Sequence, residues 1–496
     1  MNYETVIGLE VHTQLRTRSK MYCRCSAEYA STPPNTHVCP VCLGMPGVLP
    51  VINRQAIEYT IMTALALNCT VSGSTKFDRK NYPYPDLMKG YQISQYDAPI
   101  GLDGWLNIEV DGKTRKADIT RVHLEEDVAK LVHHTSTGEG NYSLVDVNRS
   151  GVPLMEIVGE PDLHSPEEAR QYLVQLHSIL QYLGVSTANM EEGSFRCDAN
   201  ISIRPEGSAE LLAKVEVKNM NSFRAVYRAL EYEASRQRKA AEADEKLVQE
   251  TRGWVEDKGV TVSQRSKEYA HDYRYFPEPD LPPLVLSPEQ VEKVRAKLPE
   301  LPEARRDRFM AEYGLSLYDA SLLTSSKGMA DYFEKGFMGE FKKLPKPDNL
   351  SAAEFAKLGS NWLLGEVSRI MNADNKDIGY FQKKVKPEHL LSLTVYNKNG
   401  VVNTATAKSM LEEMYKTEKD PKTLLEEGGR GQISDTQELE EAVSQVLADN
   451  PQAETEFRGG KETVLKFLVG QVMKATRGRA NPQLVHELLK KKLGEG

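Results

Sequence analysis

The sequence predicts an α+β protein in which an antiparallel sheet with flanking helices comes first and helices alone follow. Two observations support this fold class. Before Pro282 and Pro283, several segments alternate apolar and polar residues with a period of two, which is typical of half-buried antiparallel strands. From about residue 287 the strand signals vanish, and amphipathic helical segments continue toward the C-terminus.

Four of the predicted strands are apolar on one side and carry mainly Glu, His, Asp, Asn or Arg on the other. They are Ile7–His12, Arg121–Glu125, Asp198–Arg204 and Val215–Asn219. A solvated sheet would explain the alternation, but its polar face usually carries Thr and Lys. We therefore expect one sheet that covers a core with one face and presents a polar working surface with the other.

Three consecutive carboxylates, Glu125, Glu126 and Asp127, end the second of these strands. Adjacent carboxylates repel one another unless a cation or basic groups neutralise them. The stretch alone fits either a site for metal or phosphate chemistry or a solvated strand end.

Four of the six cysteines form two close pairs, Cys23-x-Cys25 and Cys39-x2-Cys42, with thirteen residues between the pairs. In a reducing compartment this spacing predicts a structural zinc site with four thiolate ligands. The alternatives are unliganded reduced cysteines or a disulfide, which that compartment disfavours. We expect the isolated Cys69 and Cys197 to be buried and inert.

The helices have clear sequence signals. Ser165 and Pro166 fit the N-cap and first position of a helix that Gly184 ends, and Ser287 with Pro288 repeats the start signal. Further helices are expected over about 53–67 and 222–245.

Two proline- and tyrosine-rich segments, Lys76–Asp86 and His271–Asp280, combine aromatic with basic residues. Such a composition suits contact with phosphates or RNA, and a plain surface loop remains the alternative. Residues 461–496 hold eight Lys or Arg and three Asp or Glu, and Gly428–Gly431 precede them as a flexible joint. This basic end suits nucleic-acid binding, although a solvated helix face would also explain it.

The whole chain sets further limits. Its 496 residues suggest roughly three domains, and no apolar run approaches the roughly 20 residues that span a bilayer. We expect a cytoplasmic protein, since the N-terminus enters a strand without a signal peptide. The net charge of −8 argues against coating nucleic acid over the whole surface. The sequence has no P-loop, dinucleotide fingerprint or G-x-S-x-G motif, so any use of ATP must proceed without a P-loop.

These residues resemble the B subunits of aspartyl/glutamyl-tRNA amidotransferases, the GatB family. The resemblance covers the whole chain and is most specific in six segments: Glu4–His12, Lys76–Asp86, His123–Asp127, Asp146–Glu156, Met190–Asn200 and Asp272–Pro279. It implies a ligase that uses ATP and Mg2+ to phosphorylate the side-chain carboxylate of Glu-tRNA(Gln) or Asp-tRNA(Asn). Ammonia from a glutaminase subunit, GatA, then displaces the phosphate, and a small subunit, GatC, holds the two larger subunits together.

The resemblance also implies roles for particular residues. Glu10, His12 and Glu125 resemble the family's Mg2+ site, and Glu126 is a further candidate beside them. Contacts with phosphate, substrate or ammonia are expected from the remaining candidates, which are Lys80, Tyr82, Arg196, Asp198 and Asn219. Cys23, Cys25, Cys39 and Cys42 match the zinc-bearing members.

The implied domains are a sheet-based cradle over 1–292 with a zinc knuckle at 23–42, a helical domain over 293–405, and a tail similar to the YqeY protein over 406–496 that binds tRNA. Two other functions remain open at this point. One is a scaffold subunit that binds tRNA without catalysis, and the other is a metal-dependent phosphoesterase that uses the same carboxylates.

Overall fold

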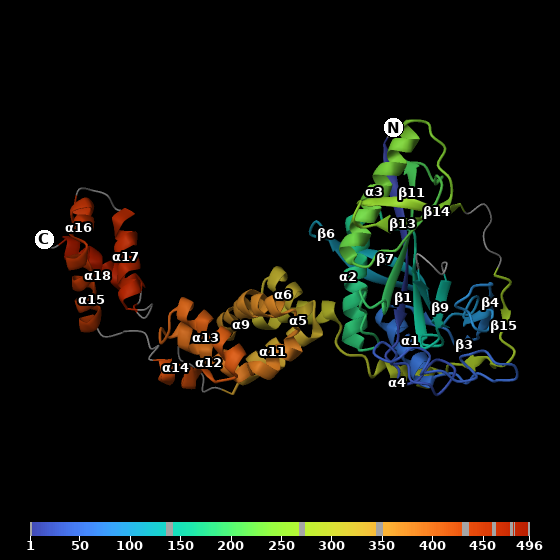
Figure 1. Ribbon diagram of the computed structural model, residues 1–496, viewed down its shortest axis with the longest axis horizontal. Helices are drawn as coiled ribbons and strands as arrows, with labels where there is room; N and C mark the ends of the chain where they lie inside the picture. Colours follow the sequence, from blue (N-terminus) through green and yellow to red (C-terminus); the bar gives the residue numbers. More distant parts are fainter. Residues whose placement is uncertain are drawn as a thin grey trace. The chain divides into compact units, whose positions relative to one another are not determined.

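The computed structural model describes residues 2–134, 142–266, 273–343, 351–428, 436–458, 463–476, 480 and 482–494. The chain divides into two compact units, Met1–Leu301 and Pro302–Gly496, which are described separately below (Figure 1). No helix in the described part of the chain has the length and hydropathy needed to cross a membrane.

A nine-stranded sheet forms the centre of the first unit, in the order β14-β13-β12-β11-β1-β10-β7-β6-β2. The strands are β1 (Tyr3–Gln14), β2 (Thr70–Val71), β6 (Gly101–Val110), β7 (Lys113–Glu126), β10 (Pro153–Gly159), β11 (Phe195–Pro205), β12 (Val215–Lys218), β13 (Glu250–Val255) and β14 (Val260–Ser266). Neighbouring strands run antiparallel except β12 and β13, which pair in parallel. The four predicted segments all lie in this sheet, on β1, β7, β11 and β12, which confirms the predicted fold class.

One face of the sheet is covered by α1 (Arg54–Ala66), α2 (Pro166–Leu183) and α3 (Phe223–Glu242), as Figure 1 shows. Ile7, Leu9 and Val11 of β1 are buried in the same hydrophobic cluster as side chains of all three helices. Because successive residues of a strand face opposite sides, Gly8, Glu10 and His12 lie on the uncovered side. The alternation of apolar and polar residues along β1 therefore places its polar side chains on the uncovered face, where they can take part in chemistry.

The predicted helix boundaries are confirmed. The Ser165 hydroxyl accepts a hydrogen bond from the backbone N–H of Glu168, and Pro166 occupies the first turn of α2. Gly184 ends this helix in the left-handed conformation, with φ of +70°. Ser222 caps α3 by the same kind of bond, and Ser287 forms a capping box at the start of α4 (Pro288–Arg295).

Smaller sheets border the large one. β4 (Asp78–Asn81) pairs with β5 (Tyr91–Ser94) and with β15 (Phe276–Pro277), β3 (Ser74–Thr75) pairs with β16 (Leu284–Val285), and β8 (Lys130–His134) pairs with β9 (Tyr142–Asp146). The two predicted aromatic-basic segments are therefore neighbours, because Phe276 pairs with Arg79. His271 and Asp272 lie outside the described residues.

The second unit contains helices and no strand among its described residues. Its helices are α5 (Pro302–Tyr313), α6 (Leu317–Thr324), α7 (Lys327–Asp331), α8 (Gly339–Phe341), α9 (Ala352–Trp362), α10 (Ser368–Asp374), α11 (Ile378–Lys384), α12 (Pro387–Lys398), α13 (Thr404–Thr417), α14 (Pro421–Gly428), α15 (Thr436–Asp449), α16 (Pro451–Arg458), α17 (Thr463–Ala475) and α18 (Pro482–Gly494), with π-helical turns at Tyr332–Met338 and Leu363–Val367.

Two hydrophobic clusters organise these helices. One extends from Phe309 to Leu424, and the other from Leu439 to Leu493. The domain limit predicted at 405/406 falls in the first turn of α13, whose Ala407 and Met410 are buried in the first of these clusters. The first residue of the predicted joint at Gly428–Gly431 is the last residue of α14, and the other three lie outside the described residues.

Candidate functional site

Three side chains converge on the uncovered face of the large sheet. His12 Nε2 lies 3.4 Å from Glu156 Oε2 and 3.7 Å from Glu125 Oε1. One nitrogen or oxygen from each of the three residues lies within 4.8 Å of the others, so the group could hold a metal ion. We call His12, Glu125 and Glu156 the triad.

Strand pairing explains why these residues meet. His12 on β1 is paired directly with Glu156 on β10, and Glu156 is paired with His123 on β7. Glu125 follows two residues after His123, so it projects from the same face. The triad therefore rests on three adjacent strands of one rigid sheet, as a precise site requires.

The electrostatics of the triad are strongly coupled. Burial alone would lower the pKa of His12, but the charges of Glu156, Glu125 and Asp198 and a hydrogen bond with Glu156 raise it to about 9. Burial opposes ionisation of Glu156, yet the charges of His123 and His12 hold its pKa well below the usual range. His123 Nε2 lies 3.2 Å from the same carboxylate oxygen. Glu156 is thus an anion between two imidazoles.

Lys80 supplies positive charge to the triad. Burial would lower the pKa of its ammonium, but the charges of Glu125 and Glu156, among others, raise it. Its Nζ lies 5.0 Å from the ring centre of Tyr273 and 5.9 Å from that of Tyr82. The two rings pack edge to face, so the aromatic-basic segments together hold this cation.

Arg196 is a second cation near the triad, opposite His12 on the neighbouring strand β11. A guanidinium nitrogen lies 3.1 Å from Asp127 Oδ2, which also accepts a hydrogen bond of 2.7 Å from Gln14. Burial opposes ionisation of Asp127, but the charges of Arg196 and Arg149 lower its pKa. Asp127 therefore anchors Arg196.

Glu10, Asp198 and Asn219 lie farther along the sheet. Glu10 is two residues from His12, and its carboxylate accepts a hydrogen bond of 2.8 Å from Asn200. The cluster of possible metal ligands contains His12, Glu125 and Glu156 but not Glu10. Asp198 accepts a hydrogen bond of 2.6 Å from Lys218, whose ammonium also lies 3.1 Å from Glu216. Asn219 follows β12 with φ of +65°.

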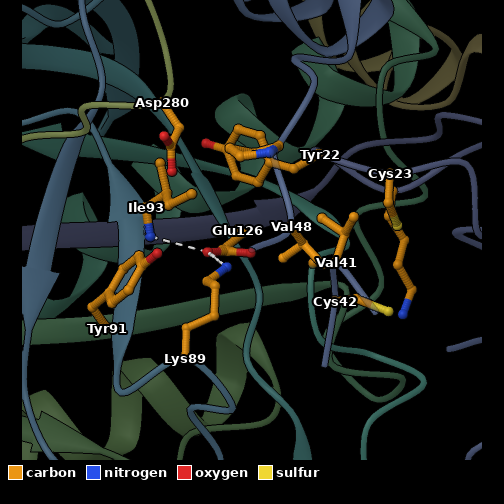
Figure 2. A pocket seen from close by; sticks show the side chains of 13 residues that line it. Tyr22, Cys23, Val41, Cys42, Val48, Lys89, Tyr91, Ile93, Glu126 and Asp280 are labelled. Atoms are coloured by element: carbon orange, nitrogen blue, oxygen red, sulfur yellow. Dashed lines mark hydrogen bonds and ion pairs between the residues drawn. The ribbon is translucent and has the colours of Figure 1, made fainter. Parts of the chain in front are cut away.

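Glu126 projects from the opposite side of β7, where Val122 and Leu124 are buried in the core. Its carboxylate pairs with Lys89 and accepts a hydrogen bond of 3.0 Å from the Ile93 backbone, as Figure 2 shows. Glu126 therefore does not join the triad, although the sequence grouped it with Glu125. Each of the three consecutive carboxylates has its own basic neighbours, which removes the expected repulsion.

A small cavity of about 30 Å³, room for about one water molecule, lies beside Glu126. Cys23 and Cys42 line it together with Glu126 and Lys89 (Figure 2). The cysteine knuckle therefore borders the core side of the strand that carries Glu125.

The four predicted cysteines do cluster, and their sulfur atoms lie within 4.8 Å of one another. The sulfurs of Cys39 and Cys42 are 3.9 Å apart, close to the roughly 3.8 Å expected in a tetrahedral site with Zn–S bonds of about 2.3 Å. A hydrogen bond from Cys23 lowers the pKa of Cys42 against the opposing effect of burial, and the Cys39 backbone and the charge of Lys20 lower it further. This donor set fits zinc.

Glu156, His123 and Tyr275 were not among the predicted site residues. Glu156 ends one of the segments that resemble the family, Asp146–Glu156, but only the strand pairing places it beside His12. Tyr275 stacks on Tyr96 at 4.1 Å, and its pKa is raised to about 12 by burial and by the charges of Glu125 and Glu156, against the lowering effect of Lys80. The alternation within β7 could have identified His123.

This arrangement suits polyphosphate chemistry. Two carboxylates and an imidazole can hold a divalent ion, and Lys80 and Arg196 can neutralise phosphoryl oxygens nearby. The imidazole is a less typical Mg2+ ligand than the carboxylates.

Comparisons with known proteins identify the family. Residues 5–292 match the family described as the GatB/GatE catalytic domain, and residues 349–493 match the GatB domain family. A Dehalococcoides mccartyi protein named as the B subunit of an aspartyl/glutamyl-tRNA(Asn/Gln) amidotransferase is 61% identical, covering 100% of this chain and 99% of its own length. Proteins of the same name from Thermomicrobium roseum and Carboxydothermus hydrogenoformans are 54% and 51% identical, each over 99% of both chains. The chain therefore belongs to the family of tRNA-dependent amidotransferase B subunits.

Proposed function

We propose that this chain is the ATP-dependent ligase component of an amidotransferase that converts Glu-tRNA(Gln), Asp-tRNA(Asn) or both into the amidated forms. The carboxylate of the aminoacyl group attacks the γ-phosphorus of ATP and releases ADP. Ammonia then attacks the resulting acyl phosphate, and phosphate leaves as the amide forms. The observation that carries the proposal is the triad with two cations beside it.

The activation step meets a simple chemical need. A carboxylate does not react with ammonia, because oxide would have to leave, whereas phosphate leaves readily. Phosphoryl transfer depends mainly on positioning and charge neutralisation. Mg2+ held by Glu125, Glu156 and His12, with Glu10 nearby, would neutralise phosphoryl oxygens in this step.

The chain's own residues would complete the environment. Lys80, held by Tyr82 and Tyr273, would contact the transferred phosphoryl group, and Arg196 would hold either phosphate or the substrate carboxylate. Asp198 and Asn219 would contact substrate or the ammonia path beyond Glu10. Glu126 would act from the core side by fixing the end of β7.

The relatives are named as B subunits, which supports the existence of partner subunits. We propose that a GatA glutaminase supplies ammonia through a channel, that GatC joins the two, and that the complex works in the cytoplasm. The helical tail would bind tRNA. Zn2+ at the four cysteines would be structural, since four thiolates leave no open coordination position.

One assay tests the ligase assignment. The purified complex receives Glu-tRNA, ATP, Mg2+ and ammonium chloride, so that no glutaminase step is needed. We expect Glu125→Gln to abolish formation of both ADP and Gln-tRNA while tRNA affinity is kept.

A matched control is Glu160→Gln. The carboxylate of Glu160 accepts a hydrogen bond of 2.7 Å from Thr120 and belongs to no part of the triad, so activity should be retained. Full activity in Glu125→Gln would contradict the ligase assignment and favour a scaffold that only presents tRNA. Phosphate released from nucleic acid without ATP would favour a phosphoesterase.

A further inference from the structure

Lys20 is an unusual residue because its side chain is completely buried. Its relative exposure is 0%, and it is among the largest fully buried side chains of the described chain. Burying an ammonium group costs several kcal/mol unless an opposite charge and hydrogen bonds compensate it. The amidation chemistry gives this lysine no role, so its counter-charge has to be identified.

The contacts of Lys20 Nζ are with backbone carbonyls. It donates hydrogen bonds of 2.8 Å to His37 O and 3.3 Å to Val147 O. Within the described ranges, no carboxylate oxygen lies within the 4.0 Å that defines an ion pair with this nitrogen. Glu126 and Asp280 line the same cavity, but Glu126 is already paired with Lys89, and a carboxylate oxygen of Asp280 lies 3.5 Å from Arg79.

The cysteine knuckle is the remaining source of negative charge. A Cβ added to Gly151 would lie 3.5 Å from Lys20 Cδ and 3.8 Å from Cys42 Cβ, so both side chains border this glycine. Lys20, Cys23 and Cys42 also line the same cavity. The Lys20 backbone N–H also donates a hydrogen bond of 2.9 Å to Cys25 O. A zinc ion with four thiolates carries a net charge of about −2. A buried cation beside it is therefore electrostatically favourable.

We propose that Lys20 is the buried counter-charge of a four-thiolate metal centre, and that it ties this centre to the loop before β10. The proposal rests on the zinc site proposed above. His37 belongs to the loop between the two cysteine pairs, and Val147 precedes the turn that leads to β10 and Glu156. The Lys20 ammonium group thus connects the cysteine knuckle to the segment that leads to Glu156.

Hydrogen bonds around Lys20 strengthen this connection. Asn148 Oδ1 accepts from the His37 backbone at 2.8 Å, and Asn148 Nδ2 donates to Pro33 O at 2.7 Å. Asn35 Oδ1 accepts from the Val147 backbone at 2.7 Å. The knuckle loop has no hydrophobic cluster of its own, so the metal and these bonds fix its position.

If Lys20 is the counter-charge, the effect of its replacement on the melting temperature should depend on whether zinc is bound. In the zinc-loaded full-length chain, Lys20→Met should weaken zinc binding about 10- to 100-fold and lower the melting temperature, because the thiolates lose their counter-charge. In the chain stripped of zinc by a chelator, the cysteines are no longer a fixed dianion. The same substitution should then leave the melting temperature unchanged or raise it, because a buried charge has been removed.

The measurements are zinc affinity by chelator competition and melting temperature by calorimetry, each with and without zinc. Lys76→Met is the control, because Lys76 Nζ lies 2.5 Å from Asp78 and 2.6 Å from Asp97. Its charge is balanced by carboxylates, so the change in melting temperature should be the same in both zinc states. Lys20→Gln retains a hydrogen-bond donor without the charge. It replaces Lys20→Met in these measurements if the Met variant does not fold.

Two results would overturn the role of Lys20. One is unchanged zinc affinity in Lys20→Met and Lys20→Gln, and the other is equal destabilisation with and without zinc, as expected if Lys20 only bonds the two carbonyls. A wild-type chain that binds no zinc would overturn the zinc site itself. The ligase assay with Glu125→Gln does not depend on either outcome.

Discussion

Replacing Glu156 with Gln should lower the pKa of His12 substantially. The rise of this pKa from 6.5 to about 9 corresponds to about 3 kcal/mol in favour of the imidazolium form. Glu156 makes the largest favourable contribution, both as a charge and as a hydrogen-bond acceptor. Its loss should therefore remove the largest part of this preference and bring the pKa back toward 6.5.

The sign of the effect on stability follows from the direction of the shift. A pKa that is raised on folding stabilises the folded state below the unfolded value of 6.5, and this contribution disappears as the pH rises through about 9. The Glu156→Gln variant, kept free of Mg2+ but with zinc present, should therefore lose stability relative to the wild type at pH 6.5 more than at pH 9.

Histidine hydrogen–deuterium exchange followed by mass spectrometry gives the pKa of each histidine separately. His177 provides an internal reference, because burial lowers its pKa and Glu156 is not among the causes. Glu160→Gln controls for the loss of a carboxylate near the end of β10. A His12 pKa that stays near 9 in Glu156→Gln, or that lies near 6.5 in the wild type, would refute the coupling inferred for the triad.

Two further predictions concern the knuckle and the tail. Metal analysis of the chain purified without chelator should find one zinc per chain, and Cys39→Ser should lose it because the tetrahedral donor set is broken; a wild type free of metal would contradict this. Deleting residues 429–496 should weaken tRNA binding about tenfold or more in a filter-binding assay and reduce its salt dependence, since the basic end is lost. Basal ATP hydrolysis should persist, because the hydrophobic cluster from Phe309 to Leu424 is left intact. Unchanged tRNA affinity would show that the tail does not bind tRNA.

The sequence predicted the sheet well because the alternation of apolar and polar residues can be seen within each strand alone. Alternation in β1, β7, β11 and β12 reports which side of each strand is buried, and one buried face defines the register of side chains on the other. Capping residues such as Ser165 and Ser287 predicted the helix starts for the same reason. Cysteine spacing located the knuckle, because all four cysteines lie within twenty residues of one another.

The composition of the site was less predictable, because it depends on pairing between distant strands. Glu156 lies beside His12 only because β10 is placed between β1 and β7 in the sheet. No pattern within a single strand reveals this strand order. Three consecutive acids suggest one cluster, but the pleat sends Glu125 and Glu126 to opposite faces. The first cluster of the second unit likewise crosses the limit predicted at 405/406, because α13 packs against helices that precede it.

The end of β7 has a consequence for how this protein can change over evolution. One short stretch of backbone carries Glu125 into the triad on the uncovered face and Glu126 toward Lys89 in the interior. A replacement of Lys89 alone would leave a buried anion without its partner and disturb the backbone on which Glu125 stands. Related sequences that alter either Lys89 or Glu126 should therefore alter both, so that these two interior positions covary although neither belongs to the triad.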